Sequence, residues 1–325
     1  MQNDYYKGKR VLVTGADGFM GSHLVDALLA QGAEVSVFVR GNSVTGTNIN
    51  QLKNLSHAEG KLNKVIGGDV GNPDTISLIK NSAPEIVFHL AADAYVPKSF
   101  EQPLEVWQTN ATGTLHVLEG ARACGAQRIV CTSSSEVYGH CAGSIDELTE
   151  MRPTSIYGAS KCAADRVAFA HHTQFGTPVA IVRPFNTYGP RHTYDVIPYF
   201  IKLAFDGKDL TVHGDGTQTR DFTYVDDTVR GFLIMGEHPD AVGRAVNFGT
   251  GTDTTVNEIA VAIQKHTGTG IGIIHGEARM AEVQKMRSNP GLAKELFGWE
   301  AQVSIDEGIR RNVEHVRAAQ RVVAV

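Results

Sequence analysis

The chain contains little cysteine and no long apolar run. No stretch approaches the roughly 18 uninterrupted apolar residues of a membrane helix. The first ten residues, MQNDYYKGKR, are polar, so no signal-peptide core is expected. The four cysteines form no CxxC pair and have no histidines at metal-ligand spacing, which predicts no metal site and reduced thiols in a cytoplasmic protein: Cys124, Cys131, Cys141 and Cys162.

The charge balance lacks a basic excess. Thirty Lys and Arg stand against 35 Asp and Glu, a net charge of −5, so neither nucleic acid nor an anionic membrane surface is expected as a partner. The chain is 42% hydrophobic and 20% charged, which is typical of a soluble globular protein. Its 325 residues predict one large domain or two moderate ones.

Short apolar runs alternate with helical patterns through the first half of the chain. Strands are expected in VLV, VSVFV, KLNKVIGGDV, EIVFHLAA, RIVCTSS and PVAIVRPFNTYG, and one long helix in PLEVWQTNATGTLHVLEGARAC. This alternation predicts an α/β fold with a Rossmann-type, doubly wound parallel sheet. The regularity loosens later, so we expect a sheet domain at 1–185, to which about 220–250 return, and a smaller α/β lobe at 186–325.

Three glycines, Gly15, Gly18 and Gly21, stand directly between the first strand and the first helix. The first allows a tight turn, the second lets the backbone approach a pyrophosphate, and the third lets helix and strand pack closely. The helix N-terminus then offers unpaired N–H groups to the phosphates. The first domain is therefore predicted to bind NAD or NADP.

The residue that ends the second strand, Arg40, is less regular, since many dinucleotide folds have an acid there. Arg40 either pairs with a 2′-phosphate, which tilts the prediction weakly toward NADP, or is a solvated strand-end side chain. Asp69 and Val70, at the end of the third strand, are expected beside the adenine. The predicted cofactor residues are Gly15, Gly18, Phe19, Met20, Arg40, Asp69, Val70, Leu90, Ala91, Ala92, Tyr157 and Lys161.

Tyr157 and Lys161 are four residues apart in a helical pattern and so share one face. An ammonium beside a phenol stabilises the phenolate and lowers its pKa toward that of a general base. Ser134, past a neighbouring strand, is a candidate to share the proton of a substrate alcohol. Together with the glycine turn, these residues predict a dehydrogenase-type active site.

The chain resembles the extended short-chain dehydrogenase/reductase family of nucleotide-sugar epimerases and dehydratases. The resemblance rests on VTGADGFMGSHL, HLAADAYVPKSF, TNATGTLHVLE, SSSEVYG, YGASK, RPFNTYGPR and TRDFTYVDD. It implies a sugar nucleotide held across two lobes and NAD(P) that stays tightly bound through the cycle. It also implies a homodimer whose four-helix bundle uses the segments around 104–123 and 158–175.

The segment SSSEVYG bears on which reaction follows oxidation at C4 of the sugar. Dehydratases of this family have Thr-Asp-Glu or Thr-Ser-Glu before VYG, and Ser134, Ser135 and Glu136 take those positions here. The resemblance implies that Glu136 removes the C5 proton, which the C4 ketone acidifies, and that Ser135 relays a proton. Epimerases usually have a small or hydroxylated residue in place of this Glu. A nucleotide-sugar 4,6-dehydratase is therefore expected.

Three alternatives stay open. UDP-glucuronate decarboxylases also have segments that resemble SEVYG and QTRDFTYVDD of this chain. A 4-epimerase can use the same scaffold. A non-catalytic cofactor-sensing protein would be expected to lose Tyr157 or Lys161, and both are present.

For substrate binding we expect Asn186, Arg191 and Arg220, since guanidinium groups match phosphate oxygens. His89 is expected to be packed or to lie at the edge of the cofactor, and Asn110 is expected to tie a strand to a helix.

Overall fold

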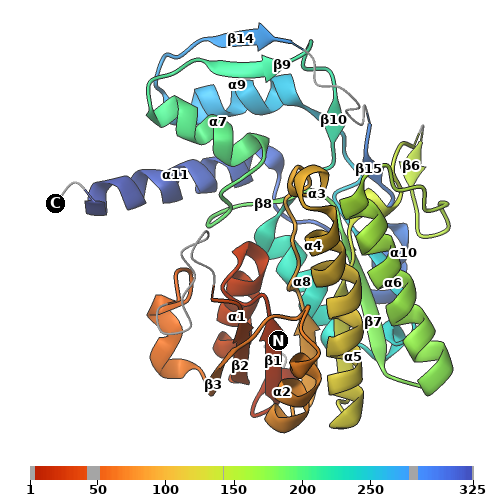
Figure 1. Cartoon of the computed structure of the whole chain (residues 1–325). Helices are drawn as coiled ribbons and strands as arrows, with labels where there is room; N and C mark the ends of the chain where they lie inside the picture. The colour runs from red at the N-terminus through yellow and green to blue at the C-terminus, as the bar shows by residue number, and fades with distance from the viewer. Residues whose placement is uncertain (1–3, 42–51, 142, 278–284, 324–325) are drawn as a thin grey trace. The chain divides into compact units, whose positions relative to one another are not determined.

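The computed structural model describes residues 4–41, 52–141, 143–277 and 285–323 (Figure 1). Its largest sheet has seven strands in the order β12-β7-β5-β4-β1-β2-β3. The pairs β1–β2, β2–β3, β1–β4, β4–β5 and β5–β7 are all parallel. The predicted Rossmann-type α/β fold is thus confirmed. The strands are β1 (Arg10–Thr14), β2 (Glu34–Val39), β3 (Lys64–Gly67), β4 (Ile86–His89), β5 (Arg128–Thr132), β7 (Val179–Pro184) and β12 (Ala245–Phe248).

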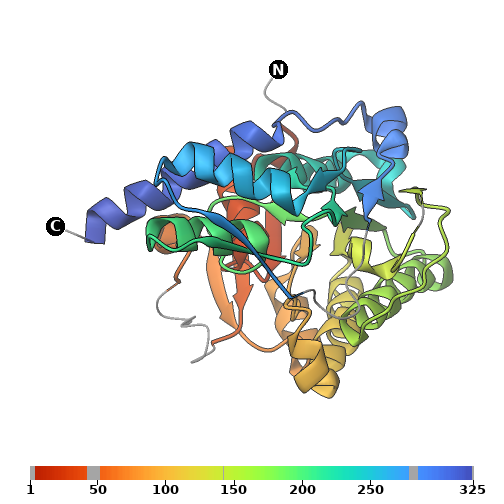
Figure 2. The same ribbon diagram turned by 90° about the horizontal axis from the view of Figure 1, so that it is seen from above.

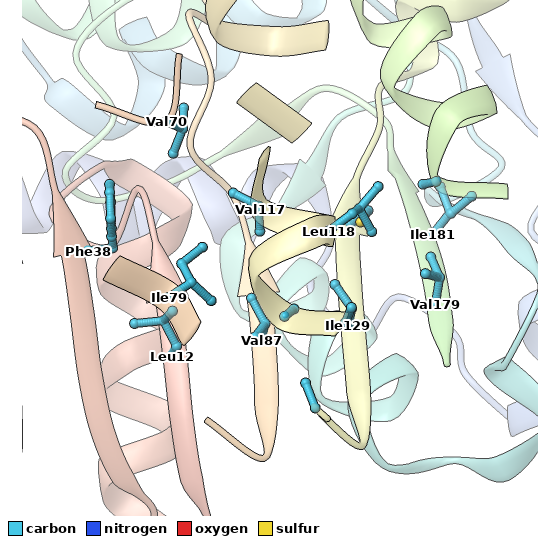
Figure 3. Packing of buried hydrophobic residues seen from close by; sticks show 14 residues of the cluster. Leu12, Phe38, Val70, Ile79, Val87, Val117, Leu118, Ile129, Val179 and Ile181 are labelled. Carbon is cyan, nitrogen blue, oxygen red and sulfur yellow. The ribbon is translucent and has the colours of Figure 1, made fainter. Parts of the chain in front are cut away.

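Helices cover both faces of this sheet. Because neighbouring residues of a strand point to opposite sides, successive residues of β4 pack against different helices. On β4, Val87 packs into an apolar cluster with residues of α2 (Asp74–Ser82) and α5 (Gly113–Ala123), as Figure 3 shows. The next residue, Phe88, lies against Tyr6 and Gly236 on the other face, where α8 (Val225–Glu237) ends. Two further helices of this layer arrangement are α1 (Phe19–Ala30) and α6 (Ile156–Phe175).

The prediction of a single long helix in PLEVWQTNATGTLHVLEGARAC is wrong in one respect. A π-helical turn, η3 (Gln108–Thr112), separates α4 (Pro103–Trp107) from α5. A short helix, α3 (Lys98–Glu101), precedes them. Such turns are often found at functional positions of helices, and this one contains Asn110.

The chain divides into two compact units. Unit 1 comprises 1–139, 150–184 and 229–246, and unit 2 comprises 140–149, 185–228 and 247–325. Short 3-10 turns also occur: η1 (Asp4–Tyr6), η2 (Ser56–Lys61), η4 (Ser135–Val137) and η5 (Pro239–Ala241). Among the described residues, no helix combines the length and apolarity needed to cross a bilayer.

In unit 2, α9 (Val256–Thr267) packs against α7 (Val196–Phe205) and α11 (Ile305–Val323), and the three lie side by side in Figures 1 and 2. Small two-stranded sheets accompany them. The remaining elements are β6 (Ser144–Ile145), β8 (Thr187–Tyr188), β9 (Leu210–His213), β10 (Thr219–Arg220), β11 (Thr223–Tyr224), β13 (Thr254–Thr255), β14 (Ile273–Gly276), β15 (Arg287–Ser288) and α10 (Gly291–Phe297).

Candidate active site

The glycine turn between β1 and α1 packs closely against the neighbouring backbone. Gly15 has a φ of +67°, and a Cβ placed there would lie 2.7 Å from the backbone nitrogen of Ala91. A Cβ on Gly21 would lie 2.2 Å from the carbonyl oxygen of Gly15. Gly18 caps α1 without a side-chain hydrogen bond to the first turn. The turn can therefore offer backbone N–H groups and the positive end of the helix dipole to an anion.

Arg40 lies between two carboxylates just beyond the end of β2. Its guanidinium is 3.5 Å from Asp69 and 3.4 Å from Asp93. Lys98 also pairs with Asp93, at 3.2 Å. A phosphate that approached Arg40 would meet these two acids as well as the guanidinium.

Asp69 and Val70 follow β3 instead of ending it, because that strand stops at Gly67. The Asp69 carboxylate accepts a hydrogen bond from the backbone N–H of Gly71, at 2.8 Å. The side chain of Val70 is buried in the apolar cluster (Figure 3). The expected position of both residues at a strand end is therefore wrong by two or three residues, although they still lie at the carboxyl side of the sheet.

A buried chain of hydrogen bonds fixes the end of β4. His89 contacts the hydroxyl of Thr14 through Nδ1, at 2.8 Å, and that of Thr114 through Nε2, at 3.0 Å. The Thr114 hydroxyl donates to the carbonyl of Asn110, so it accepts from His89, whose Nδ1 then accepts from Thr14. Burial, with a smaller effect of the Lys161 ammonium, lowers the pKa of His89 to about 3. His89 is thus a neutral, packed side chain.

The same chain of hydrogen bonds continues through η3. The Asn110 amide accepts from the backbone N–H of Asp93 at 2.8 Å and donates to its carbonyl at 3.1 Å. It also donates to the hydroxyl of Ser160 on α6, at 3.0 Å. Asn110 therefore connects the segment that follows β4 with the helix that bears Tyr157. On the other side, the Thr14 hydroxyl accepts from the N–H of Ala91, at 3.2 Å, and so holds the predicted cofactor segment 90–92.

Tyr157 and Lys161 lie in the first two turns of α6 and are both buried. The helix begins after Ser155, whose hydroxyl accepts from the N–H of Gly158 and so supplies the cap that its first turn needs. The Lys161 ammonium donates to the carbonyl of Thr132 at the end of β5. Burial lowers the pKa of Lys161 to about 8, against a smaller opposing effect of Cys131 and Asp165.

Glu136 lies in η4, which is separated from the end of β5 by Ser133 and Ser134. Its backbone N–H donates to the hydroxyl of Ser134, at 3.2 Å, so Ser134 still has its own proton to donate. A Cβ on Gly158 would lie 2.8 Å from the carbonyl oxygen of Glu136, so this turn packs directly on the first turn of α6. Ser135 is buried beside it. Unit 1 therefore places the five predicted catalytic residues on α6, on η4 and at the N-cap of η4, and α6 and η4 are in contact.

The predicted substrate residues Asn186, Arg191 and Arg220 belong to unit 2. The carbonyl of Asn186 accepts from the N–H of Thr223, and Arg220 donates to the carbonyl of Thr219. Arg191 has a φ of +68°. Together with His315 and other residues of α11, it lines a cavity of about 510 Å³.

Among the described residues, no cluster of histidines, cysteines or acids is suited to hold a metal ion. His171 bonds to Thr177 and Glu119. His172 bonds to the carbonyl of Thr177. These two neighbouring histidines therefore have structural contacts.

The sequence did not point to three buried residues near this site: Arg183, Asp165 and Tyr138. The Arg183 guanidinium donates to the Asp165 carboxylate, at 2.8 and 3.1 Å, and to the Tyr138 hydroxyl, at 2.8 Å. Arg166 is also paired with Asp165. No spacing rule joins residues of three different elements, so only the charge of Arg183 in an apolar strand could have drawn attention to them.

The chain is similar to known proteins over nearly its whole length. A sequence model of the family described as GDP-mannose 4,6 dehydratase matches residues 12–312. UDP-glucose 4-epimerase of Mycolicibacterium smegmatis is 33% identical, over 95% of this chain and 98% of the epimerase. UDP-glucuronic acid decarboxylase 1 of Xenopus tropicalis is 34% identical, over 95% of this chain and 72% of the decarboxylase.

A solved structure of a dehydratase is similar as well. DesIV from Streptomyces venezuelae, a dTDP-glucose 4,6-dehydratase crystallised with NAD, superimposes with a TM-score of 0.86. It is 29% identical to this chain, and the alignment covers 96% of this chain and 98% of DesIV. The relatives' names thus include an epimerase, a decarboxylase and a dehydratase, and the choice among them depends on the residues of the site.

Proposed function

The chain belongs to the extended short-chain dehydrogenase/reductase family of NAD-dependent epimerases and dehydratases, and on that premise we propose that it is a nucleotide-sugar 4,6-dehydratase. One observation carries the proposal, and it separates a dehydratase from a 4-epimerase. Glu136 lies in a turn that is capped by Ser134 and packed on Gly158, next to Tyr157. Oxidation at C4 needs only the phenol, the ammonium and a hydroxyl, whereas a carboxylate at this position suits removal of a proton from C5.

Each residue then has a defined proton to move. Tyr157, with the Lys161 ammonium on its helix face, takes the proton of the C4 hydroxyl, which Ser134 helps to orient. The turn of Gly15, Gly18 and Gly21 would hold NAD(P), which would supply reversible hydride transfer with the sugar. Glu136 takes the C5 proton, and the C6 hydroxyl leaves as water with a proton that Ser135 relays. One proton is returned to C5, so the net change is the loss of one water and the product is a 4-keto-6-deoxy sugar nucleotide.

For the cofactor, the glycine turn fits a dinucleotide pyrophosphate, and the surroundings of Arg40 favour NAD over NADP. Asp69 and Asp93 already occupy the Arg40 guanidinium, at 3.5 and 3.4 Å. A 2′-phosphate would have to displace these ion pairs and tolerate the freed carboxylates. The DesIV relative was crystallised with NAD. The weak tilt toward NADP that Arg40 alone suggests is therefore reduced.

The sugar nucleotide is proposed to contact unit 2. Arg191 and Arg220 supply guanidinium groups for the diphosphate, and the Asn186 amide is suited to a phosphate or sugar oxygen. The buried Oδ1 of Asn186 has no hydrogen-bond partner among the described residues, so a ligand donor would satisfy it.

The proposed homodimer uses segments 104–123 and 158–175.

The decisive experiment pairs product masses with one substitution. The protein is incubated with UDP-N-acetylglucosamine, dTDP-glucose, GDP-mannose and UDP-glucuronate, and the mass of each product is measured by mass spectrometry. We expect loss of water from one sugar nucleotide. The Glu136→Gln variant should still reduce the bound cofactor but release almost no product. Glu150→Gln, at an exposed position, is the matched control. Full water loss by Glu136→Gln contradicts the assignment.

The main competing function is decarboxylation of UDP-glucuronate. It is favoured by the 34% identity to the Xenopus decarboxylase, and by the SEVYG segment. In the same panel, loss of CO2 from UDP-glucuronate identifies this activity, and an unchanged mass with altered stereochemistry identifies an epimerase. A bound cofactor that no sugar nucleotide reduces identifies a sensor protein.

A further inference from the structure

A buried guanidinium joins the two elements that bear the proposed catalytic residues. Arg183 projects from β7, and its side chain is only 2% exposed. It donates two hydrogen bonds to the Asp165 carboxylate and one to the Tyr138 hydroxyl. Its guanidinium carbon also lies 5.4 Å from the centre of the Tyr138 ring. Asp165 and Tyr138 are themselves fully buried.

The partners of Arg183 belong to different elements. Tyr138 directly follows η4, two residues after Glu136, and its N–H bonds back to the carbonyl of Ser135. Asp165 lies on α6, one turn beyond Lys161 and two beyond Tyr157. The proposed base and the proposed phenol–ammonium pair thus come from separate elements. One rigid guanidinium bonds to Tyr138 beside the first element and to Asp165 on the second.

Stability alone does not require this arrangement. Burying charges costs desolvation energy, and apolar residues of similar volume are often at least as stabilising. A planar guanidinium with three directed hydrogen bonds does, however, fix distance and angle between the groups that it joins. We propose that Tyr138, Arg183 and Asp165 are positioning residues that set the place of Glu136 relative to Tyr157 and Lys161. The inference rests on the proposed function, in which Glu136 removes the C5 proton.

The test uses Tyr138→Phe, which removes one hydroxyl and keeps the ring. The substrate is the panel member that loses water, prepared with deuterium at C4 or at C5. We expect kcat to fall about tenfold, the effect of one lost hydrogen bond near the upper end of the usual range. The isotope effect from C5 should rise and that from C4 should fall, because only the proton-abstraction step is slowed.

Two further measurements separate positioning from a general loss of structure. Hydrogen–deuterium exchange of the ligand-free protein should be faster in the peptide that covers 133–139. The matched control is Tyr6→Phe, which removes another buried hydroxyl of unit 1, bonded to the carbonyl of Leu233 at 2.6 Å. Tyr6→Phe should leave both isotope effects and the exchange rate of the 133–139 peptide unchanged. In a Glu136→Gln background, where the bound cofactor is still reduced, Tyr138→Phe should not slow that reduction.

The outcomes are distinct. The inference is overturned if Tyr138→Phe keeps the isotope effects and the exchange of the wild type. It is also overturned if Tyr138→Phe slows cofactor reduction about tenfold in the Glu136→Gln background. A wild-type protein that removes water from no sugar nucleotide overturns the proposed function, and this inference with it. Water loss by the wild type with the expected change in Tyr138→Phe supports both.

Discussion

The Lys161 ammonium donates a hydrogen bond to the carbonyl of Thr132, at 2.5 Å, and so joins α6 to the end of β5. Because the ammonium is buried, the pKa of Lys161 falls from its usual 10.5 to about 8. The charge that is proposed to stabilise the Tyr157 phenolate is therefore lost within an accessible range of pH. The burial of this ammonium, between α6 and the end of β5, is therefore expected to set a pH dependence of activity.

The first prediction concerns that dependence. We expect kcat/KM to fall as the pH rises through about 8, because Lys161 loses its proton and the phenolate loses its partner. Stability should change in the opposite direction. Between about 8 and 10.5 the unfolded chain still binds the proton that the folded protein has released, so the free energy of unfolding rises with pH.

The measurements are a pH–rate profile and urea unfolding over the same range. The Lys161→Arg variant, which keeps its charge, should lose the basic decline, even if its activity is lower throughout. A decline that persists unchanged in Lys161→Arg would assign it to another group.

A second prediction concerns acid. His89 is buried with a pKa of about 3, so below about pH 6.5 the unfolded chain binds a proton that the folded protein does not. Stability should therefore be lost as the pH falls from about 6.5 toward 3. His89→Gln keeps one donor and one acceptor for Thr14 and Thr114 but does not titrate, so its acid slope should be flatter.

Urea unfolding at several pH values between about 6.5 and 5 measures these slopes. The exposed His140 provides the control, and His140→Gln should keep the slope of the wild type. Equal slopes for His89→Gln and the wild type would show that other groups cause the acid sensitivity.

Local patterns predicted the parts of this site that depend on local geometry. The glycine turn, the parallel strands and the pair Tyr157–Lys161 follow from spacing along one or two elements. The ion pairs of Arg40 with Asp69 and Asp93, in contrast, join positions 29 and 53 residues apart. A single sequence contains no periodic signal for such contacts.

The same reason explains the other differences. Arg183 and Tyr138 are 45 residues apart and meet only because β5 and β7 are neighbours in the sheet. The π-helical turn at Asn110 interrupts a segment with continuous helical periodicity, since Asn110 bonds to Asp93 and Ser160. Tertiary contacts determined both features, and propensity did not.

A third prediction tests the glycine turn. A Cβ on Gly21 would lie 2.2 Å from the carbonyl oxygen of Gly15, a backbone atom that can move only if the turn moves. We expect Gly21→Ala to destabilise the protein by about 1–3 kcal/mol, as overpacking generally does. It should also weaken NAD binding, because the displaced turn no longer presents its N–H groups to the pyrophosphate.

Thermal unfolding and calorimetric titration with NAD measure the two effects. A Cβ on Gly60 would have no atom within 4 Å, and Gly60 has no positive φ, so Gly60→Ala is the matched control. The structural account of the turn fails if Gly21→Ala binds NAD as tightly as Gly60→Ala.

The last prediction tests the proposed dimer. Leu104, in α4, is 83% exposed and Leu115, in α5, is 41% exposed, and both lie in the segment proposed to pair with a second copy. A dimer interface would remove such apolar surface from water. We expect the wild type to sediment as a dimer and the Leu104→Ser, Leu115→Ser double variant as a monomer. Leu148 is 94% exposed but lies outside both segments, so Leu148→Ser should remain dimeric. A monomeric wild type, or a double variant that sediments like the wild type, contradicts this interface.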